Sequence, residues 1–277
     1  MPYRPYGQNI LITGASSGIG LACLHLFAKK GYQVWAVSRS GADHIDVPDS
    51  VRFSKMDVTD ANSVAVGMEQ IWKDAVQRTQ DGIGIIIHCA GYGIGGAAED
   101  TPIAAVQDQM ETNYFGVLRV NSEILPLMRS RSRSLVIVLG SIAGRISIPY
   151  QSHYSASKFA LEAYVEALRI EGASHGIHAT IVEAGDTHTE FTNKRVLAIP
   201  TDSPYLDDAK RAIGKMEQDE RKGYAPEKVA SVVYSVSTRR HPPVRIAVGV
   251  SYKLLMLAKR LLPDRIVEWI LSRLYVG

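Results

Sequence analysis

Tyr154 and Lys158 stand four residues apart at the start of an expected helix, so their side chains share one helical face. An isolated tyrosine keeps its proton up to about pH 10, and a neighbouring ammonium favours the phenolate and lowers that pKa. The pair is therefore a candidate general acid/base for proton transfer at neutral pH. Because the same spacing is common on ordinary amphipathic helices, the spacing alone does not establish catalysis.

A glycine-rich turn follows the first expected strand and runs Thr13-Gly14-Ala15-Ser16-Ser17-Gly18-Ile19-Gly20. Its glycines would allow a tight turn and a close approach to a pyrophosphate, whose charge the N–H groups and dipole of the next helix favour. Such a turn can be purely structural, but its place between a strand and a helix in a βαβ series favours a dinucleotide site. The expected dinucleotide contacts in the turn are Gly14, Ser16, Ser17, Gly18, Ile19 and Gly20.

Ser38 and Arg39 end the second expected strand, where an acidic residue would bind the ribose 2′-hydroxyl of NAD. This chain has no carboxylate there to repel a 2′-phosphate, and the Arg39 guanidinium can pair with one. The two residues therefore favour NADP as the cofactor. Arg39 is also compatible with an ordinary solvated charge, because the sequence does not fix where its side chain points.

Apolar runs and helical patterns alternate along most of the chain, as they must to position these residues. The expected strands are Asn9–Thr13, Gln33–Val37, Val51–Met56, Ile83–Ile87, Leu135–Leu139, Ile177–Val182 and Val244–Val248. The expected helices are Leu21–Lys30, Asp60–Arg78, Thr101–Arg129, Tyr154–Ala173 and Pro226–Ser237. This order predicts an α/β, single-domain Rossmann fold with a doubly wound, seven-stranded parallel sheet and helices on both faces. The segment between Arg39 and Val51 is expected to be a loop, because it holds Gly, Pro and several Asp.

No linker or repeat divides the chain, so residues 1–250 are expected to form one catalytic domain. Within it, residues 186–223 are polar with weak helical stretches, which predicts a mobile substrate lid. Residues 251–277 are expected to form an amphipathic tail of two short helices on either side of Pro263. Packing on its own domain or on a partner subunit is the first interpretation of this tail, and peripheral contact with a membrane is the second.

From Gln8 to about Val250, the chain resembles the short-chain dehydrogenase/reductase family. The family's T-G-x-x-x-G-x-G turn matches residues 13–20, and its Tyr-x-x-x-Lys pair matches YSASK. Its adenine-contacting Asp-Val pair matches Asp57 and Val58. Its helical asparagine matches Asn113, and its serine after the fifth strand matches Ser141. Several ordered motifs carry more weight together than any one of them carries alone.

The resemblance implies that Tyr154 protonates a carbonyl oxygen during reduction, or deprotonates an alcohol during oxidation, while Ser141 orients that oxygen. It implies that Lys158 lowers the tyrosine pKa and binds the nicotinamide ribose, and that Asn113 holds a water in a proton relay. The cofactor contacts that it implies beyond the glycine turn and the second strand are Asp57, Val58, Ala90, Gly91, Tyr154, Lys158 and Thr189.

The expected function is an NADP(H)-dependent interconversion of a carbonyl and a secondary alcohol by hydride transfer. A non-catalytic dinucleotide-binding redox sensor or scaffold is the alternative, but it would not need an intact set of Asn113, Ser141, Tyr154 and Lys158. Two motifs depart from the family. His88-Cys89 replaces Asn-Asn, so His88 is interpreted as a structural substitute, and Ala184 replaces the proline that stiffens the loop before Thr189.

The composition excludes several classes of protein. The chain has 277 residues, 46% hydrophobic and 21% charged, which is typical of a globular rather than a disordered protein. A net charge of +3 without a cluster of basic residues gives no indication of a nucleic-acid-binding surface. Two cysteines and no ligand cluster predict neither disulfides nor a metal site. Without a signal-peptide pattern or a long apolar run, a cytoplasmic location is expected, with the tail offering peripheral membrane contact.

The expected substrate is a small hydrophobic alcohol or ketone of steroid-, retinoid- or lipid-like character. The loop after the fifth expected strand is apolar, through Ile142, Ile146, Ile148, Pro149 and Tyr150. The segment around Tyr154 and Lys158 also resembles the hydroxysteroid and retinol branch of the family. The resemblance to the family as a whole implies a homodimer or homotetramer. The tail holds five basic and two acidic side chains, so its formal charge of +3 equals that of the whole chain.

Overall fold

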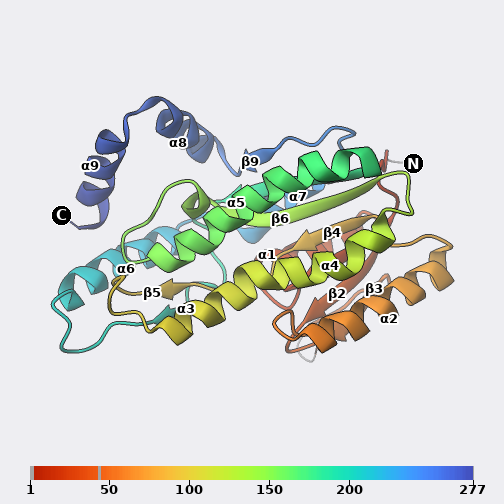
Figure 1. Ribbon diagram of the computed structural model, residues 1–277, viewed down its shortest axis with the longest axis horizontal. Helices are drawn as coiled ribbons and strands as arrows, with labels where there is room; N and C mark the ends of the chain where they lie inside the picture. Colours follow the sequence, from red (N-terminus) through yellow and green to blue (C-terminus); the bar gives the residue numbers. More distant parts are fainter. Residues whose placement is uncertain (1–2, 43–44, 277) are drawn as a thin grey trace.

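Seven parallel strands form the central sheet of the computed structural model, which describes residues 3–42 and 45–276 (Figure 1). The strands are β1 (Asn9–Thr13), β2 (Gln33–Ser38), β3 (Val51–Lys55), β4 (Ile85–His88), β6 (Ser134–Ser141), β7 (Ile177–Ala184) and β9 (Arg245–Ala247). Their order is β3-β2-β1-β4-β6-β7-β9, so the chain changes direction across the sheet between β1 and β4. This confirms the expected doubly wound Rossmann fold.

Helices cover both faces of the sheet, and alternate residues of each strand supply the two cores. The covering helices are α1 (Gly18–Lys29), α2 (Ala61–Thr79), α4 (Gly116–Met128), α5 (Ser152–Gly172) and α7 (Pro226–Ser237). Ile10 and Ile12 of β1 belong to the core with α1 and α7, whereas Leu11 belongs to the core with α2, α4 and α5. Burial on both sides explains why the inner strands β1, β4 and β6 are mostly apolar, whereas the edge strand β3 is not.

Three elements differ from the expectation. The helix expected over Thr101–Arg129 is α3 (Ile103–Met110), a π-helical turn (Glu111–Phe115) and α4 in succession. A second sheet pairs β5 (Ile94–Gly95) with β8 (Val196–Leu197), and these strands are too short to leave a pattern. The expected lid contains a well-formed helix, α6 (Leu206–Arg221). Between Arg39 and Val51 the described residues form no helix or strand, and residues 43–44 of that expected loop lie outside the described ranges.

The tail forms α8 (Val250–Leu261) and α9 (Asp264–Tyr275), which lie on either side of Pro263 as expected. In Figure 1 the two helices stand at the side of the molecule, and α9 descends toward α6. No residue of either helix is fully buried. No helix within residues 3–42 or 45–276 is long and apolar enough to cross a membrane.

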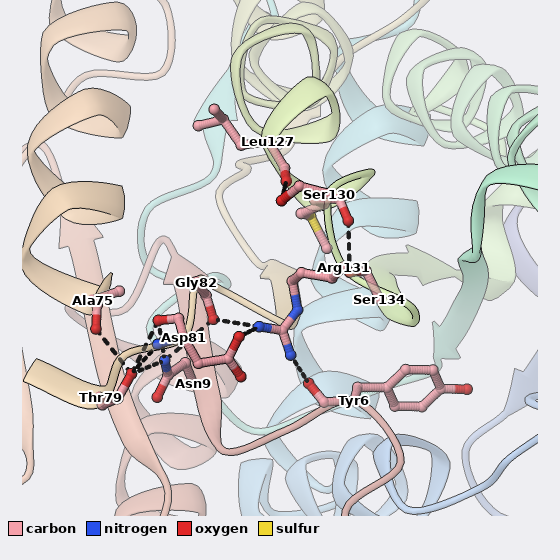
Figure 2. Close-up of polar contacts among 11 residues, drawn as sticks. Tyr6, Asn9, Ala75, Thr79, Asp81, Gly82, Leu127, Ser130, Arg131 and Ser134 are labelled. Atoms are coloured by element: carbon pink, nitrogen blue, oxygen red, sulfur yellow. Dashed lines mark hydrogen bonds and ion pairs between the residues drawn. The ribbon is translucent and has the colours of Figure 1, made fainter. Parts of the chain in front are cut away.

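The amino edge of the sheet is closed by a polar network, which Figure 2 shows. Asn9 is fully buried at the start of β1, and its Nδ2 donates to Thr79 Oγ1 at 2.6 Å and to the Asp81 carbonyl at 2.9 Å. Arg131 forms an ion pair with Asp81 and donates to the Tyr6 carbonyl at 3.1 Å. These contacts fix the loops that enter β1, β4 and β6.

Candidate active site

A cavity of about 1220 Å³ lies at the opposite, carboxyl edge of the sheet. Ligands bind at this edge in open parallel sheets, and the volume exceeds the usual 300–1,000 Å³ or so of a small-molecule site. The expected site residues that line it are Gly14, Ser16, Ser17, Gly18, Ile19, Gly20, Ser38, Arg39, Asp57, Val58, Ala90, Gly91, Ser141, Tyr154, Lys158 and Thr189. The fold therefore gathers segments that are far apart in the sequence into one site.

The glycine turn has the geometry that a phosphate group requires. Gly14 and Gly18 have φ angles of 65° and 54°, and a Cβ on Gly14 would stand 2.5 Å from the Ala90 nitrogen. Ser17 makes no side-chain capping hydrogen bond at the start of α1, so that helix end lacks a side-chain acceptor for its N–H groups. The N-terminus of α1 can therefore receive an anion from the cavity.

Arg39 lies at the rim of the cavity near Asp57. Burial raises the pKa of Asp57, but hydrogen bonds from Thr59 and the Arg39 charge outweigh it, so the net shift is downward. The Thr59 nitrogen and hydroxyl donate to Asp57 Oδ1 at 2.9 and 2.8 Å. Arg39 forms no ion pair among the described residues, whereas Ser38 is buried and its hydroxyl accepts from Gly41 N at 3.1 Å. The Arg39 guanidinium thus remains available to an anion.

Tyr154, Ser141 and Lys158 all line the cavity. Burial raises the pKa of Tyr154 to about 12, while a hydrogen bond with Ser141 acts in the opposite direction. Lys158 donates from Nζ to the Leu139 carbonyl at 2.9 Å, and Nζ lies 5.8 Å from the centroid of the Tyr154 ring. Burial lowers the pKa of Lys158 to about 8.

The sequence predicted a lowered pKa for Tyr154, and in this respect the structure differs. Desolvation of the buried phenol dominates, and the Lys158 ammonium is directed at a backbone carbonyl. At neutral pH the Tyr154 hydroxyl therefore keeps its proton, and Lys158 is mostly protonated. The arrangement favours a proton donor over a proton acceptor at Tyr154.

Asn113 is the one expected site residue that does not line the cavity. It is fully buried in the π-helical turn, which is a frequent feature of functional sites. Its Nδ2 donates to the Tyr92 carbonyl at 3.0 Å and to Ser157 Oγ at 3.1 Å, and its Oδ1 accepts from Tyr92 N at 3.0 Å. Asn113 therefore ties the chain after β4 to α5 behind the cavity wall, and its expected role in a proton relay stays a prediction.

His88 serves as a structural group. Burial lowers its pKa to about 4, so the ring is neutral at pH 7. Its Nε2 lies 2.9 Å from Asn121 Oδ1, and Asn121 Nδ2 donates to the Tyr164 hydroxyl at 3.0 Å. The chain of contacts connects β4 with α4 and α5, which agrees with the interpretation of His88 as a brace of the sheet.

Part of the cavity wall is formed by residues that sequence reasoning did not place there. The lining residues of the tail include Leu255, Leu262, Val267, Ile270, Leu271 and Leu274. Phe191 of the lid lies with its ring centroid 5.6 Å from that of Tyr154. Ile142, Ile146 and Ile148 line the cavity as expected, but Pro149 and Tyr150 do not. The periodicity of the tail predicted its helices, yet nothing in it indicates which surface they cover.

A glycine turn and a Tyr–Lys pair in one cavity of a doubly wound sheet define an oxidoreductase site. A family model described as short chain dehydrogenase matches residues 8–199, and the chain belongs to that family. It is 37% identical over 271 residues to the 3-ketodihydrosphingosine reductase of Bacteroides thetaiotaomicron, covering 97% of this chain and 98% of that protein. It is 32% identical over 260 residues to a probable short-chain type dehydrogenase/reductase of Helicobacter pylori, covering 92% and 93%. A solved short-chain dehydrogenase from Streptomyces avermitilis superposes with a TM-score of 0.77, at 28% identity over 94% of each chain.

Proposed function

We propose that this chain is an NADP(H)-dependent oxidoreductase that reduces a ketone of a long-chain, lipid-like substrate to a secondary alcohol. The observation that carries the proposal is the make-up of the cavity wall: it combines a proton donor, Tyr154, with the apolar side chains of the tail helices. The similarity to a 3-ketodihydrosphingosine reductase, which covers most of the tail, favours a long-chain ketone over a steroid or retinoid ketone.

Residues of the chain itself would hold the cofactor. The start of α1 and the glycine turn would bind the pyrophosphate, and Asp57 and Val58 would contact the adenine side. Arg39 would pair with a 2′-phosphate, since no carboxylate at the end of β2 repels one. When bound, the nicotinamide supplies the hydride that the carbonyl carbon accepts.

The protons would be handled by three side chains. Tyr154, with a pKa of about 12, would donate its proton to the ketone oxygen. Ser141, which is hydrogen-bonded to Tyr154, would orient that oxygen. The Lys158 ammonium, with a pKa of about 8, would stabilise the phenolate left behind. The high pKa of Tyr154 keeps this residue in the protonated form that reduction requires near neutral pH.

The apolar part of the cavity wall sets an expectation for substrate length. Each methylene that leaves water for an apolar surface contributes about 0.8 kcal/mol, or roughly fourfold in affinity. The tail side chains offer such a surface beyond the reacting groups. We therefore expect kcat/KM to rise steeply with chain length until the cavity is filled.

The test is NADPH oxidation with 3-ketodihydrosphingosine, a series of shorter ketones, a steroid ketone and retinal. The highest kcat/KM is expected for the long-chain ketones. Two adjacent leucines give a matched pair of variants, because Leu262 lines the cavity while Leu261 is 73% exposed. In the absence of lipid vesicles, Leu262→Ser is expected to raise KM for long but not short ketones, and Leu261→Ser to change neither. A rate independent of chain length, or a preference for retinal or the steroid, contradicts the proposal.

A further inference from the structure

The tail is apolar on two opposite sides of α8. Tyr252, Leu255 and Leu262 face the cavity. The positions i, i+4, i+7 and i+11 of the helix form a second stripe on the other side. That stripe consists of Val250, Leu254, Leu257 and Leu261, which are 70%, 61%, 55% and 73% exposed. Own-domain packing therefore accounts for one side of α8 and leaves the other uncovered.

The second tail helix repeats this division. Val267, Leu271 and Leu274 of α9 line the cavity. Ile266 and Trp269 are exposed, and Trp269 is 61% exposed. We call the exposed residues Val250, Leu254, Leu257, Leu261, Ile266 and Trp269 the outer face of the tail.

This concentration of exposed apolar side chains is unlike the rest of the surface. Nine of the twenty large hydrophobic side chains that are exposed among the described residues lie between residues 250 and 276. Exposed hydrophobic residues that are scattered singly need no explanation, whereas a contiguous group marks an interaction site.

The outer face is accompanied by basic groups without partners. Lys253, Arg260, Arg265 and Arg273 are exposed and form no ion pair among the described residues, while Lys259 pairs with Asp264 at 2.7 Å. Helical spacing places Arg265 and Arg273 beside Trp269. The tail thus presents apolar and positive groups together, and its formal charge is +3.

The inner side of the tail is fastened to the domain at both ends. Near its start, the Tyr252 hydroxyl accepts from Asp186 N at 2.9 Å and donates to the Asp186 carboxylate. At its end, Arg211 of α6 donates to the Val276 carbonyl at 2.9 Å. Between these points Met256 and Leu271 pack on a small apolar cluster around Ile142 and Ile146. These attachments hold the outer face away from the body of the protein.

We propose that the outer face of the tail docks on an anionic lipid bilayer, with α8 and α9 lying in its interface. Apolar stripes flanked by Lys and Arg, with an exposed tryptophan, are what such a surface binds. A second copy of the chain would instead bring two surfaces of formal charge +3 together, which disfavours it as the occupant. The short helices fit a peripheral rather than a spanning contact.

Docking there would also place the cavity mouth at the bilayer. Leu255, Ile270 and Leu274 line the cavity and are at the same time 42%, 36% and 54% exposed. Apolar surface therefore continues from the cavity lining to the outside of the tail. A lipid-like ketone could enter along it without crossing water, and this part of the inference rests on the proposed function.

The test is sedimentation of the full-length protein with vesicles of phosphatidylcholine alone or with roughly a third phosphatidylglycerol. Binding to the anionic vesicles is expected at low salt, weaker binding to the neutral ones, and at least a tenfold loss at high salt. Leu257→Ser/Trp269→Ser is expected to lose at least about tenfold in binding at both salt concentrations. Val66→Ser/Val76→Ser on α2 is the control, because both valines are exposed and distant in sequence from the tail.

The charge contribution is measured separately. Arg265→Gln/Arg273→Gln is expected to weaken binding to anionic vesicles by about fivefold for each residue, and Lys29→Gln/Lys228→Gln to have little effect. Wild-type protein that does not bind anionic vesicles, or tail variants that bind like wild type, overturns the proposal. A fall in oligomeric mass of Leu257→Ser/Trp269→Ser by light scattering, with its melting temperature kept, would assign the face to a second copy and also overturns it.

Turnover separates this inference from the proposed function. The outer-face variant is expected to keep wild-type activity on a short soluble ketone and to lose activity on a long-chain ketone presented in anionic vesicles. Vesicle binding without turnover of any ketone would leave the docking surface standing and refute the proposed function. Equal loss of both activities would instead assign the outer face to the active domain and overturn the docking.

Discussion

The two edges of the central sheet differ in how they treat polar groups. At the amino edge, buried Asn9 and half-buried Arg131 donate to neighbouring carbonyls and a carboxylate, and the loops there are tied together (Figure 2). At the carboxyl edge, Tyr154 and Lys158 are buried with displaced pKa values beside a large cavity. One edge uses buried polar groups for stability, and the other keeps them desolvated for chemistry.

This difference predicts that substitutions at the two edges of the sheet affect different properties of the protein. A change at the amino edge should lower the free energy of unfolding and leave the turnover of the folded protein intact. A change in the cavity should remove turnover and leave stability intact. The predictions below test that separation, from the largest effect to the smallest.

Tyr154→Phe is expected to lower kcat/KM by about a thousandfold, within the range of 10²–10⁴ or so typical of a positioned acid. The substitution removes the proton that Tyr154 would donate and preserves the ring beside Phe191. Its free energy of unfolding should stay within about 1 kcal/mol of that of wild type, because the removal of a buried hydroxyl offsets the loss of its hydrogen bond with Ser141. Steady-state rates and urea unfolding measure the two effects.

The control for Tyr154→Phe is NADPH binding, which is measured by fluorescence and should be retained. A variant that turns over as fast as wild type would remove Tyr154 as the acid. A variant that is inactive because it has unfolded would instead break the proposed separation between the edges.

Asn9→Ala is expected to lower the free energy of unfolding by about 3 kcal/mol. The Asn9 amide donates to Thr79 Oγ1 and to the carbonyls of Asp81 and Gly82, and its removal leaves these buried acceptors without that donor. The kcat of the folded fraction should not change. Asn62→Ala on α2, where the side chain is exposed, is the control and should shift stability by less than about 0.5 kcal/mol. A large loss of kcat in Asn9→Ala would contradict the separation.

Much of this architecture could be predicted from the sequence. The bounds of β1 and α7 agree with the expectation, and most other elements differ at their ends by one to three residues. Parallel strands that are buried on both faces have unbroken apolar runs, and a glycine turn has a recognisable motif. Both can therefore be predicted from a short stretch of sequence. Sixteen of the site residues expected from these motifs line the cavity.

The features that could not be predicted from the sequence depend on packing between segments that are distant along the chain. The π-helical turn at Asn113 adds one residue to a helix whose pattern is otherwise continuous. The raised pKa of Tyr154 follows from its burial, with Phe191 of the lid packed beside it, which no local spacing encodes. The two sides of α8 are both apolar, so periodicity alone could not tell the cavity side from the outer face.

His88 lies at the carboxyl edge of the sheet but serves as a structural group. Its lowered pKa predicts that the free energy of unfolding depends on pH. Its pKa is about 4 in the folded protein and about 6.5 when exposed, so below pH 6.5 the unfolded chain binds the extra proton. Stability from this residue is therefore full above pH 6.5 and is lost as the pH falls toward 4, by about 2 kcal/mol at pH 5. Urea unfolding at pH 7.5 and pH 5 measures it.

His88→Asn should remove about that much of the acid destabilisation, since asparagine does not titrate and can still bond to Asn121. His25→Asn, at an exposed position of α1, should leave the slope unchanged. If wild type and His88→Asn lose stability equally between the two pH values, the histidine is not the buried neutral group described here.

Arg39→Gln tests the rim of the cavity, where exposure to solvent makes the expected effect the smallest. An exposed guanidinium that pairs with a phosphate contributes about 1.4 kcal/mol once solvent screening is included, or roughly tenfold in kcat/KM. The loss should be confined to NADPH, and NADH should be used as before, because only the 2′-phosphate distinguishes the two. Arg52→Gln on β3, an exposed arginine that does not line the cavity, should change neither value. An equal loss with both cofactors would show that Arg39 acts on the shape of the site and not on the phosphate. A loss of kcat/KM confined to NADPH, without any change in the free energy of unfolding, would show that the contrast between the two edges also holds at the exposed rim of the cavity.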